Sequence, residues 1–130
     1  MNIVIGEDRA IGLAARYIVL TLDTFRVDAQ TDPVKSFCVI ETVPIDQLAQ
    51  IEHWQDLHEN LIVNYGKKNW DYCLQAIEHL MGRWNGQVDS FYVNLAARIT
   101  TQMNRAADDT WSPIIDRVAT DTSSVSFHAD

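Results

Sequence analysis

The chain has 130 residues, of which 47% are hydrophobic, and a formal net charge of -8 at pH 7. This length suits one domain with a buried core, and the composition is that of a folded protein. The negative charge argues against a nucleic-acid partner, because phosphate binding requires a positive field. Apolar runs such as residues 17–20 are too short to span a membrane, and no secretory signal opens the chain, so we expect a soluble, cytoplasmic protein.

The first part of the chain predicts a β-hairpin. Residues 17–27 are rich in β-branched and aromatic side chains, which indicate a strand, and residues 35–43 predict a second, antiparallel strand. A helix over residues 9–25 is the alternative, because the apolar residues there also share one helical face. Residues 2–6 fit a short strand and residues 7–15 a turn of helix. The glycine spacing and the lysine of a phosphate-binding loop are absent from this segment.

Three amphipathic helices are predicted for the middle of the chain. Apolar residues recur at steps of three and four in residues 45–65, 70–83 and 89–105, which gives each helix one inward face. Gly66 predicts a left-handed end to the first helix, Asn69 predicts a cap for the second, and Asp89 or Ser90 predicts a cap for the third. The inward positions are Ile51, Trp54, Leu57, His58, Leu61 and Tyr65, then Trp70, Cys73, Leu74, Ile77, Leu80 and Met81, and then Phe91, Tyr92, Leu95, Ala96, Ile99 and Met103.

These elements predict an α+β fold, mainly α. An N-terminal antiparallel β-hairpin packs on three antiparallel helices, because a hairpin is marginal alone and short links favour antiparallel neighbours. We expect residues 1–106 to form one domain and residues 107–130 an irregular acidic tail. Either Trp111 pins the start of this tail onto the helices, or the tail stays disordered until a partner orders it.

In the helical core, Tyr65, Trp70, Cys73 and Ile77 are followed by the Ser-x-Tyr of residues 90–92 and by Arg98. This pattern resembles a tetratricopeptide-like helical hairpin. More narrowly, this pattern is similar to the terminal helical segment that follows some bacterial class III nucleotide cyclase domains. The resemblance implies a divergent hairpin stabilised by the β-element, not a solenoid, because the chain lacks a second repeat. It implies no cyclase activity, since the catalytic domain with its metal-binding aspartates is absent. The whole chain also looks somewhat like small uncharacterised proteins of marine bacteriophages and bacteria.

Catalytic and metal-binding groups are sparse in the sequence. His53 and His58 are five residues apart, whereas histidines that share a metal on one helix are three or four apart, so we interpret both as half-exposed side chains. Cys38 and Cys73 predict two buried, reduced thiols, with a single disulfide as the alternative. A dyad of Cys73 with His79 is conceivable only through folding. We therefore expect no catalytic residue, no metal and no cofactor.

Two charged residues carry open alternatives. Asp23 lies within the first predicted strand, near Arg26. It fits the exposed face of an edge strand, where a charge discourages unwanted pairing, and its alternative is a buried catalytic acid. Arg98 is expected to pair with Asp89 or with another acid across the helices.

The aromatic residues suggest how the protein acts. Trp and Tyr dominate binding hot spots, and Trp84 and Trp111 are the tryptophans that we expect to be exposed. The predicted partner-binding residues are Trp84, Tyr92, Trp111, Ile114 and Ile115. The sequence thus predicts a non-enzymatic module for protein–protein interaction or self-association, with a hairpin edge as a second route and a virion assembly as one setting. The alternative is a small-molecule or regulatory domain with a pocket between hairpin and helices.

Overall fold

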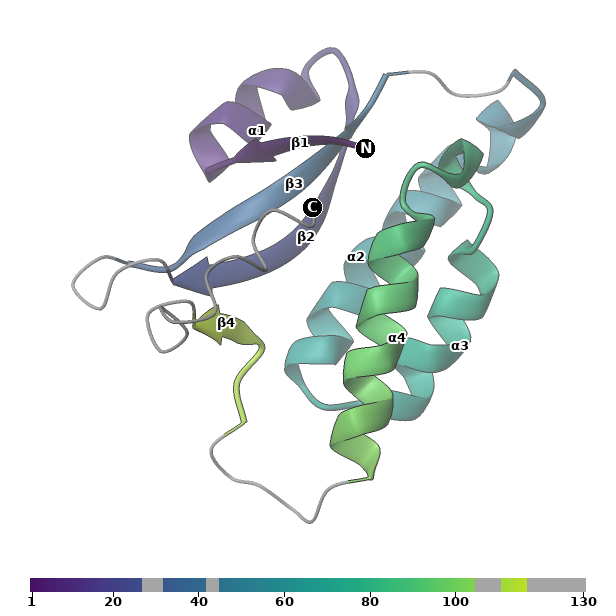
Figure 1. Cartoon of the computed structure of the whole chain (residues 1–130). Helices are drawn as coiled ribbons and strands as arrows, with labels where there is room; N and C mark the ends of the chain where they lie inside the picture. Colours follow the sequence, from purple (N-terminus) through teal and green to yellow (C-terminus); the bar gives the residue numbers. More distant parts are fainter. Residues whose placement is uncertain (27–31, 42–44, 105–110, 117–130) are drawn as a thin grey trace.

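The structure is a computed structural model that describes residues 1–26, 32–41, 45–104 and 111–116. It confirms the α+β class, with the N-terminal strands β2 and β3 preceding the three helices α2, α3 and α4 (Figure 1). The elements are β1 (Asn2–Ile5), α1 (Glu7–Ala14), β2 (Ile18–Arg26), β3 (Val34–Ile40), the 3-10 helix η1 (Ile45–Gln50), α2 (Ile51–Gly66), α3 (Trp70–Leu80), the 3-10 turn η2 (Trp84–Gly86), α4 (Asp89–Met103) and β4 (Ile114–Asp116).

The described sheet has four strands in the order β1-β3-β2-β4. The antiparallel hairpin of β2 and β3 is confirmed, and the alternative helix over residues 9–25 is not formed. β1 pairs antiparallel with β3, and β4 pairs parallel with β2. The expectation of an irregular tail is therefore wrong for Ile114–Asp116, because these residues take backbone hydrogen-bonding positions beside β2.

Helices cover both faces of the sheet (Figure 1). In β3 the side chains of Cys38 and Ile40 join the core formed with α2, α3 and α4. The alternate residues Phe37 and Val39 are also buried, and by the alternation of the strand they lie on the opposite face, where Phe37 lines a cavity together with Ala10 of α1. Burial on two faces explains why residues 37–40 of β3 are all apolar.

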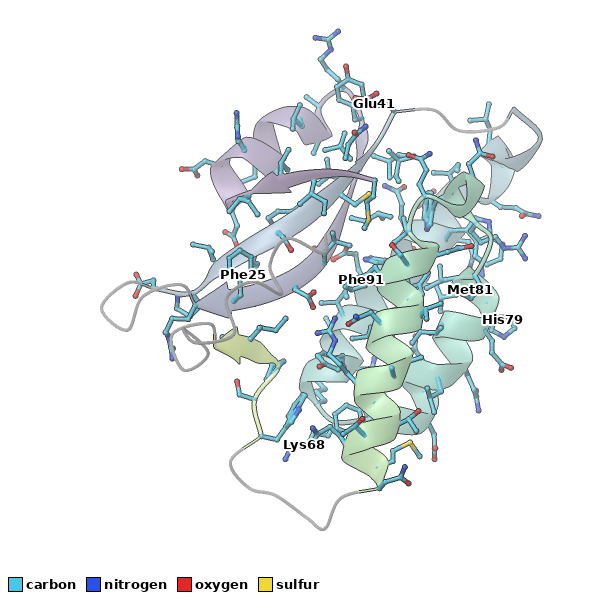
Figure 2. The ribbon with its side chains drawn as sticks, in the orientation of Figure 1. Phe25, Glu41, Lys68, His79, Met81 and Phe91 are labelled. Atoms are coloured by element: carbon cyan, nitrogen blue, oxygen red, sulfur yellow. The ribbon has the colours of Figure 1, made fainter. Side chains whose placement is uncertain are left out.

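The three predicted helices form the main core. Their buried members include Leu61, Ile77, Leu95 and Ile99, all at positions of the predicted inward faces. Phe91 lies on the side of α4 that faces the sheet (Figure 2). No helix among the described residues is long and apolar enough to cross a bilayer.

The connection between α2 and α3 differs from the prediction in its details. Gly66 is the last residue of α2, and the left-handed conformation falls on Lys68, with φ of 63°. The amide of Asn69 donates to the carbonyl of Asn64, which closes the helix end in a Schellman pattern. Asn69 does precede α3 as predicted, but its side chain donates to the Asn64 side chain at 2.7 Å and makes no capping bond.

A β-bulge in β2 directs one carboxylate toward the helices. The register shifts between Thr21 and Thr24, where Leu22 and Asp23 both oppose Ser36. The amide of Asp23 donates to Ser36 Oγ at 3.1 Å, and this hydroxyl donates to the Asp23 carbonyl at 3.2 Å. The Ser36 side chain thus provides the hydrogen bonds that the interrupted strand pairing does not. Because a bulge places an extra residue, the Asp23 side chain can point to α4 although Leu22 already faces the core.

Both cysteines are free and fully buried, as predicted. Burial raises the pKa of each thiol to about 11. We expect iodoacetamide at pH 8 to label the native protein at least about a hundredfold more slowly than a free thiol, because the thiolate is both scarce and shielded. Labelling should become complete in denaturant, and mass spectrometry measures both rates. Fast labelling of either residue in native buffer would contradict this core.

Candidate functional site

The five predicted anchors lie in two separate places. Trp84 and Tyr92 are 1% and 0% exposed, inside the helical core. Trp111, Ile114 and Ile115 lie together at the junction of the helices and the sheet, where they line a cavity. Only the second group has accessible side chains, and the prediction that Trp84 is exposed is wrong. Tyr92 is buried on the inward face of α4, as the helical periodicity predicts, so it also has no surface to offer a partner.

A chain of hydrogen bonds explains why Trp84 and Tyr92 are internal. Trp84 Nε1 donates to the Tyr92 hydroxyl at 3.2 Å, and that hydroxyl lies 2.8 Å from His58 Nδ1. His58 Nε2 lies 2.6 Å from the carbonyl oxygen of Thr21 in β2. Since a carbonyl only accepts, Nε2 carries the proton, and Nδ1 accepts from Tyr92. Each hydrogen-bonding atom of these buried rings therefore has a partner within the core.

The loop before α4 turns Trp84 inward. Gly82, Trp84, Asn85 and Gly86 all have positive φ values, between 57° and 80°. A bulky residue seldom takes this conformation, so the surrounding contacts hold it there. Asp89, predicted as a cap, is instead the first residue of α4, and its Oδ1 accepts the amide of Gly82 at 2.8 Å.

His58 carried two predictions: its inward position in the helical repeat is confirmed, and its interpretation as a half-exposed side chain is wrong. It is 0% exposed, whereas His53 is exposed as expected. The sequence does contain the relevant signal, because His58 occupies an inward position between Trp54 and Leu61 in the helical repeat. Burial lowers the pKa of His58, partly opposed by its hydrogen bond to Thr21 and by the charge of Glu59.

The accessible anchor, Trp111, lies in an aromatic cluster. Its ring meets Tyr65 edge-on with centroids 5.3 Å apart, and Trp70 edge-on at 5.1 Å. The Lys68 ammonium lies 5.6 Å from the Trp111 ring centroid. Each such aromatic pair contributes about 0.5–1.5 kcal/mol beyond area burial. Trp111 therefore pins the segment leading to β4 onto the connection between α2 and α3, which is one of the two alternatives left open by the sequence.

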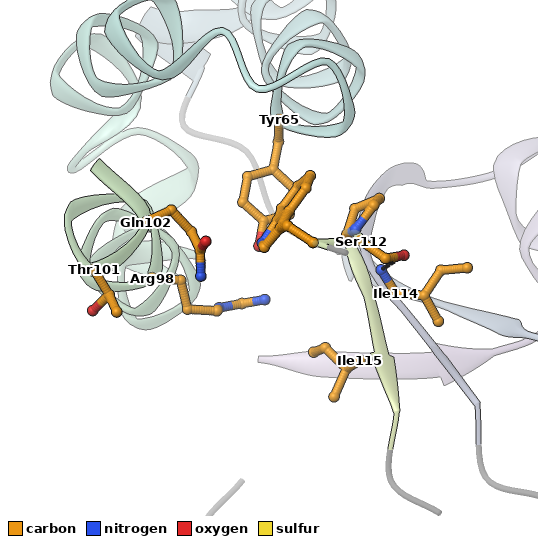
Figure 3. Close-up of a pocket in the computed structure, with 9 residues that line it drawn as sticks. Tyr65, Arg98, Thr101, Gln102, Ser112, Ile114 and Ile115 are labelled. Atoms are coloured by element: carbon orange, nitrogen blue, oxygen red, sulfur yellow. Dashed lines mark hydrogen bonds between the residues drawn. The ribbon is translucent and has the colours of Figure 1, made fainter. Parts of the chain in front are cut away.

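A cavity of about 230 Å³ lies between this segment and α4 (Figure 3). Arg98, Thr101 and Gln102 of α4 form one wall, and Ser112, Ile114 and Ile115 form the opposite wall, with Tyr65 closing the end. Three of the predicted partner-binding residues thus line one hollow. They belong to it through tertiary folding, because the tail and the helices are far apart in sequence.

Arg98 in this cavity is already paired. Its Nη1 and Nη2 donate to the two carboxylate oxygens of Asp23 at 3.0 and 3.2 Å, and its Nε donates to Asn94 at 2.9 Å. The interpretation of Asp23 as a charge on the exposed face of an edge strand is wrong, because its carboxylate is partly buried and pairs with Arg98 of α4. Arg98 likewise pairs with an acid of the sheet, not with Asp89. A bidentate pair of this kind fixes α4 on β2.

The two edges of the sheet differ in what covers them. On the β2 side, β4 covers Thr24, Phe25 and Arg26. Further along this side, the amide of Thr21 donates to Glu59 Oε2 at 3.1 Å, and its carbonyl accepts from His58. Side chains of α2 therefore replace a strand there. Sequence patterns do not reveal this, because it depends on how α2 approaches the sheet.

On the other side, β1 is an open edge among the described residues. The amide of Gly6 donates to the Lys35 carbonyl at 2.9 Å, which shows that the backbone groups of Gly6 face β3. By the alternation of an antiparallel pair, the amides and carbonyls of Ile3 and Ile5 point away from β3. Their side chains are 45% and 46% exposed, and no residue of β1 is charged. Natural edge strands usually carry a lysine, a proline or a bulge that prevents pairing.

The described residues hold no cluster of three or more His, Cys, Asp or Glu side chains suited to a metal ion. His79 lies on the outer side of α3, away from the buried Cys73 (Figure 2). The conceivable dyad of these two residues is thus not assembled. Comparison of the chain with protein-family models, curated proteins and solved structures gives no match.

The burial of His58 predicts a pH dependence of stability. A folded-state pKa below the unfolded value means that the unfolded chain binds more protons, so stability is complete above about pH 6.5 and falls as the pH drops below it. The loss approaches about 1.4 kcal/mol per pH unit for this one group. Urea unfolding between pH 7.5 and 5 measures it.

His58→Gln removes this titration and should flatten the dependence, although it lowers stability at pH 7.5. His53→Gln, on the exposed face of the same helix, is the matched control and should leave the dependence unchanged. Equal slopes in the wild type and in His58→Gln would show that His58 does not cause the loss.

Trp111→Ala should release the segment that leads to β4. We expect a loss of about 2 kcal/mol, because two edge-on ring contacts and part of the ring burial disappear. Hydrogen exchange at Ile115, whose neighbour Ile114 donates its amide to Ser112 instead of to β2, should accelerate more than exchange in α3. Trp111→Phe keeps an aromatic ring and should retain most of the protection. Unchanged exchange in Trp111→Ala would mean that the segment is held by other contacts.

Proposed function

We propose that this protein is a non-enzymatic association module that joins a second copy of itself through β1. The single observation that supports this is the unprotected edge described above. Ile3 and Ile5 direct free backbone donors and acceptors outward, and both side chains are about half exposed. Strand addition at an open edge uses these groups for affinity.

The geometry of β1 favours an antiparallel, two-fold arrangement. If Val4 faces Val4 of the second copy, then Ile3 of each chain pairs with Ile5 of the other. Both of these residues direct their hydrogen-bonding groups outward, so this register uses all four groups of each strand. Ile3 and Ile5 lie on the same sheet face as Cys38 and Ser36, their partners in β3. Four isoleucines would therefore form one apolar cluster across the two-fold axis.

Electrostatics supports β1 over the rest of the surface. The chain carries a formal net charge of -8, so most contacts between copies bring like charges together. The uncharged strand Asn2–Ile5 avoids this repulsion. The β2 side is closed by β4, His58 and Glu59, and it offers no comparable row of free groups within the described residues.

This proposal keeps the association function but moves the contact residues. Trp84 and Tyr92 serve the core, and Trp111 serves the attachment of β4, so Ile3 and Ile5 replace them as the anchors. A subunit of a larger assembly, such as a virion component, is the setting in which such a module would act. A longer sheet shared by two copies would give that assembly a rigid joint.

Ile3→Pro tests the strand addition. The amide of Ile3 points away from β3, so proline at this position removes a hydrogen-bond donor to the second copy without breaking the pairing of β1 with β3. Light scattering across a concentration series should show that the wild type approaches twice the monomer mass. The Ile3→Pro variant should remain a monomer at the same concentrations, with far-ultraviolet circular dichroism unchanged.

Two variants complete this test. Ile3→Val keeps the amide and an apolar side chain and should dimerise nearly as well as the wild type. Val4→Pro removes an amide that points toward β3 and should lower stability instead. A wild type that stays monomeric throughout, or a dimer that persists in Ile3→Pro, would refute association through β1.

A further inference from the structure

A second and larger cavity, of about 380 Å³, lies between α1, the face of the sheet that α1 covers, and α2. This volume falls in the range of small-molecule sites, which are mostly apolar with a few polar groups. Apolar walls come from Ala10 and Ala14 of α1, Val19 of β2 and Phe37 of β3. Ile11 stands at the rim and is 70% exposed.

One carboxylate at the mouth of this cavity is held in place. Glu59 Oε2 accepts the amide of Thr21 at 3.1 Å, and Oε1 accepts the Thr21 hydroxyl at 2.9 Å. Two bonds from one residue fix the plane of the carboxylate before any ligand arrives. Each oxygen retains a further acceptor site, because an ionised carboxylate can accept about four hydrogen bonds.

The charge of Glu59 is not balanced by the protein around the cavity. The other charged groups there are Glu7 and Lys35, and these pair with each other at 3.3 Å. No basic side chain forms a salt bridge with Glu59 within the described parts of the chain. The cavity therefore has apolar walls, an internally compensated ion pair and one positioned negative charge.

We propose that this cavity binds a small organic cation, namely a primary ammonium group on an apolar body. The ammonium would donate to the free acceptor sites of Glu59, and the apolar body would lie against Phe37, Val19 and Ala10. An ammonium is a compact point charge with three donors, which suits a carboxylate whose oxygens are already partly used. This site is independent of β1, which lies on the other side of β3.

The smaller cavity beside Trp111 does not support the same inference. Its one guanidinium, that of Arg98, is neutralised by Asp23, and no group there is left with a clear charge preference.

In the larger cavity, the carboxylate of Glu59 is partly hydrated. Its contribution to the binding of an ammonium ligand is therefore modest, about fivefold in affinity, as is usual for exposed ion pairs.

The test compares two probes of matched shape, 2-phenylethylammonium and 2-phenylethanol, titrated into the wild-type protein at pH 7.5 and followed by NMR. We expect the ammonium to bind about fivefold more tightly than the alcohol. Shifts should concentrate on the amides of Ala10, Ala14, Val19 and Phe37. The preference should shrink in high salt, because salt screens an exposed pair.

Glu59→Gln should abolish the preference and leave the affinity for 2-phenylethanol unchanged. The amide can keep both contacts with Thr21 by accepting from its backbone and donating to its hydroxyl. Asp56→Asn removes an equal charge from the exposed part of α2 outside the cavity and is the matched control. Ala14→Leu should fill the cavity and weaken both probes.

Equal affinity for the two probes in the wild type would overturn the proposal. It would also fail if the shifts map elsewhere, or if Asp56→Asn lowers the preference as much as Glu59→Gln. None of these outcomes bears on the dimer, whose test is the mass of the Ile3→Pro variant.

Discussion

The structure depends on the contact between α2 and the backbone of Thr21. Two adjacent side chains of one helix, His58 and Glu59, take the carbonyl and the amide of a single strand residue. The backbone groups of Thr21 that face away from β3 thus find hydrogen-bond partners on a helix instead of on a strand. His58 extends this contact through Tyr92 to Trp84, so that one residue connects the sheet with α4 and the turn before it. Asp23 and Arg98 provide a second attachment further along β2. These polar contacts orient the helices, whereas the apolar core supplies most of the stability.

This contact also gives the molecule its asymmetry. Because α2 and β4 occupy the β2 side, the sheet can extend only beyond β1 within the described residues. The same approach of α2 creates the larger cavity, since Glu59 stands where the helix, the strand and α1 meet. The two proposed activities, association and cation binding, therefore both depend on the way in which α2 packs against β2. They lie on opposite sides of β3 and can operate together.

Much of the fold could be predicted from the sequence. Helical periodicity located α2, α3 and α4, and β-branched residues located β2 and β3, because local pattern and burial agree there. The misplaced residues are those whose surroundings are made by distant segments. Trp84 follows a loop of left-handed residues that carries it inward, and Asp23 is turned by a bulge that only the register reveals. β4 is too short to show a pattern. The β1 edge was not identified, because an edge is defined by the neighbours that a strand lacks.

The parallel pairing of β4 with β2 has a consequence for synthesis on the ribosome. β1, β2 and β3 emerge within the first 40 residues and can pair early, because their contacts are close in sequence. Thr24 meets Ile114 only after the whole helical region has been made, so this pairing closes a long loop. At the stage when only β1, β2 and β3 have emerged, the β2 side of the described sheet lacks both α2 and β4. A nascent chain would therefore expose the β2 edge as well as the β1 edge until the later elements cover it.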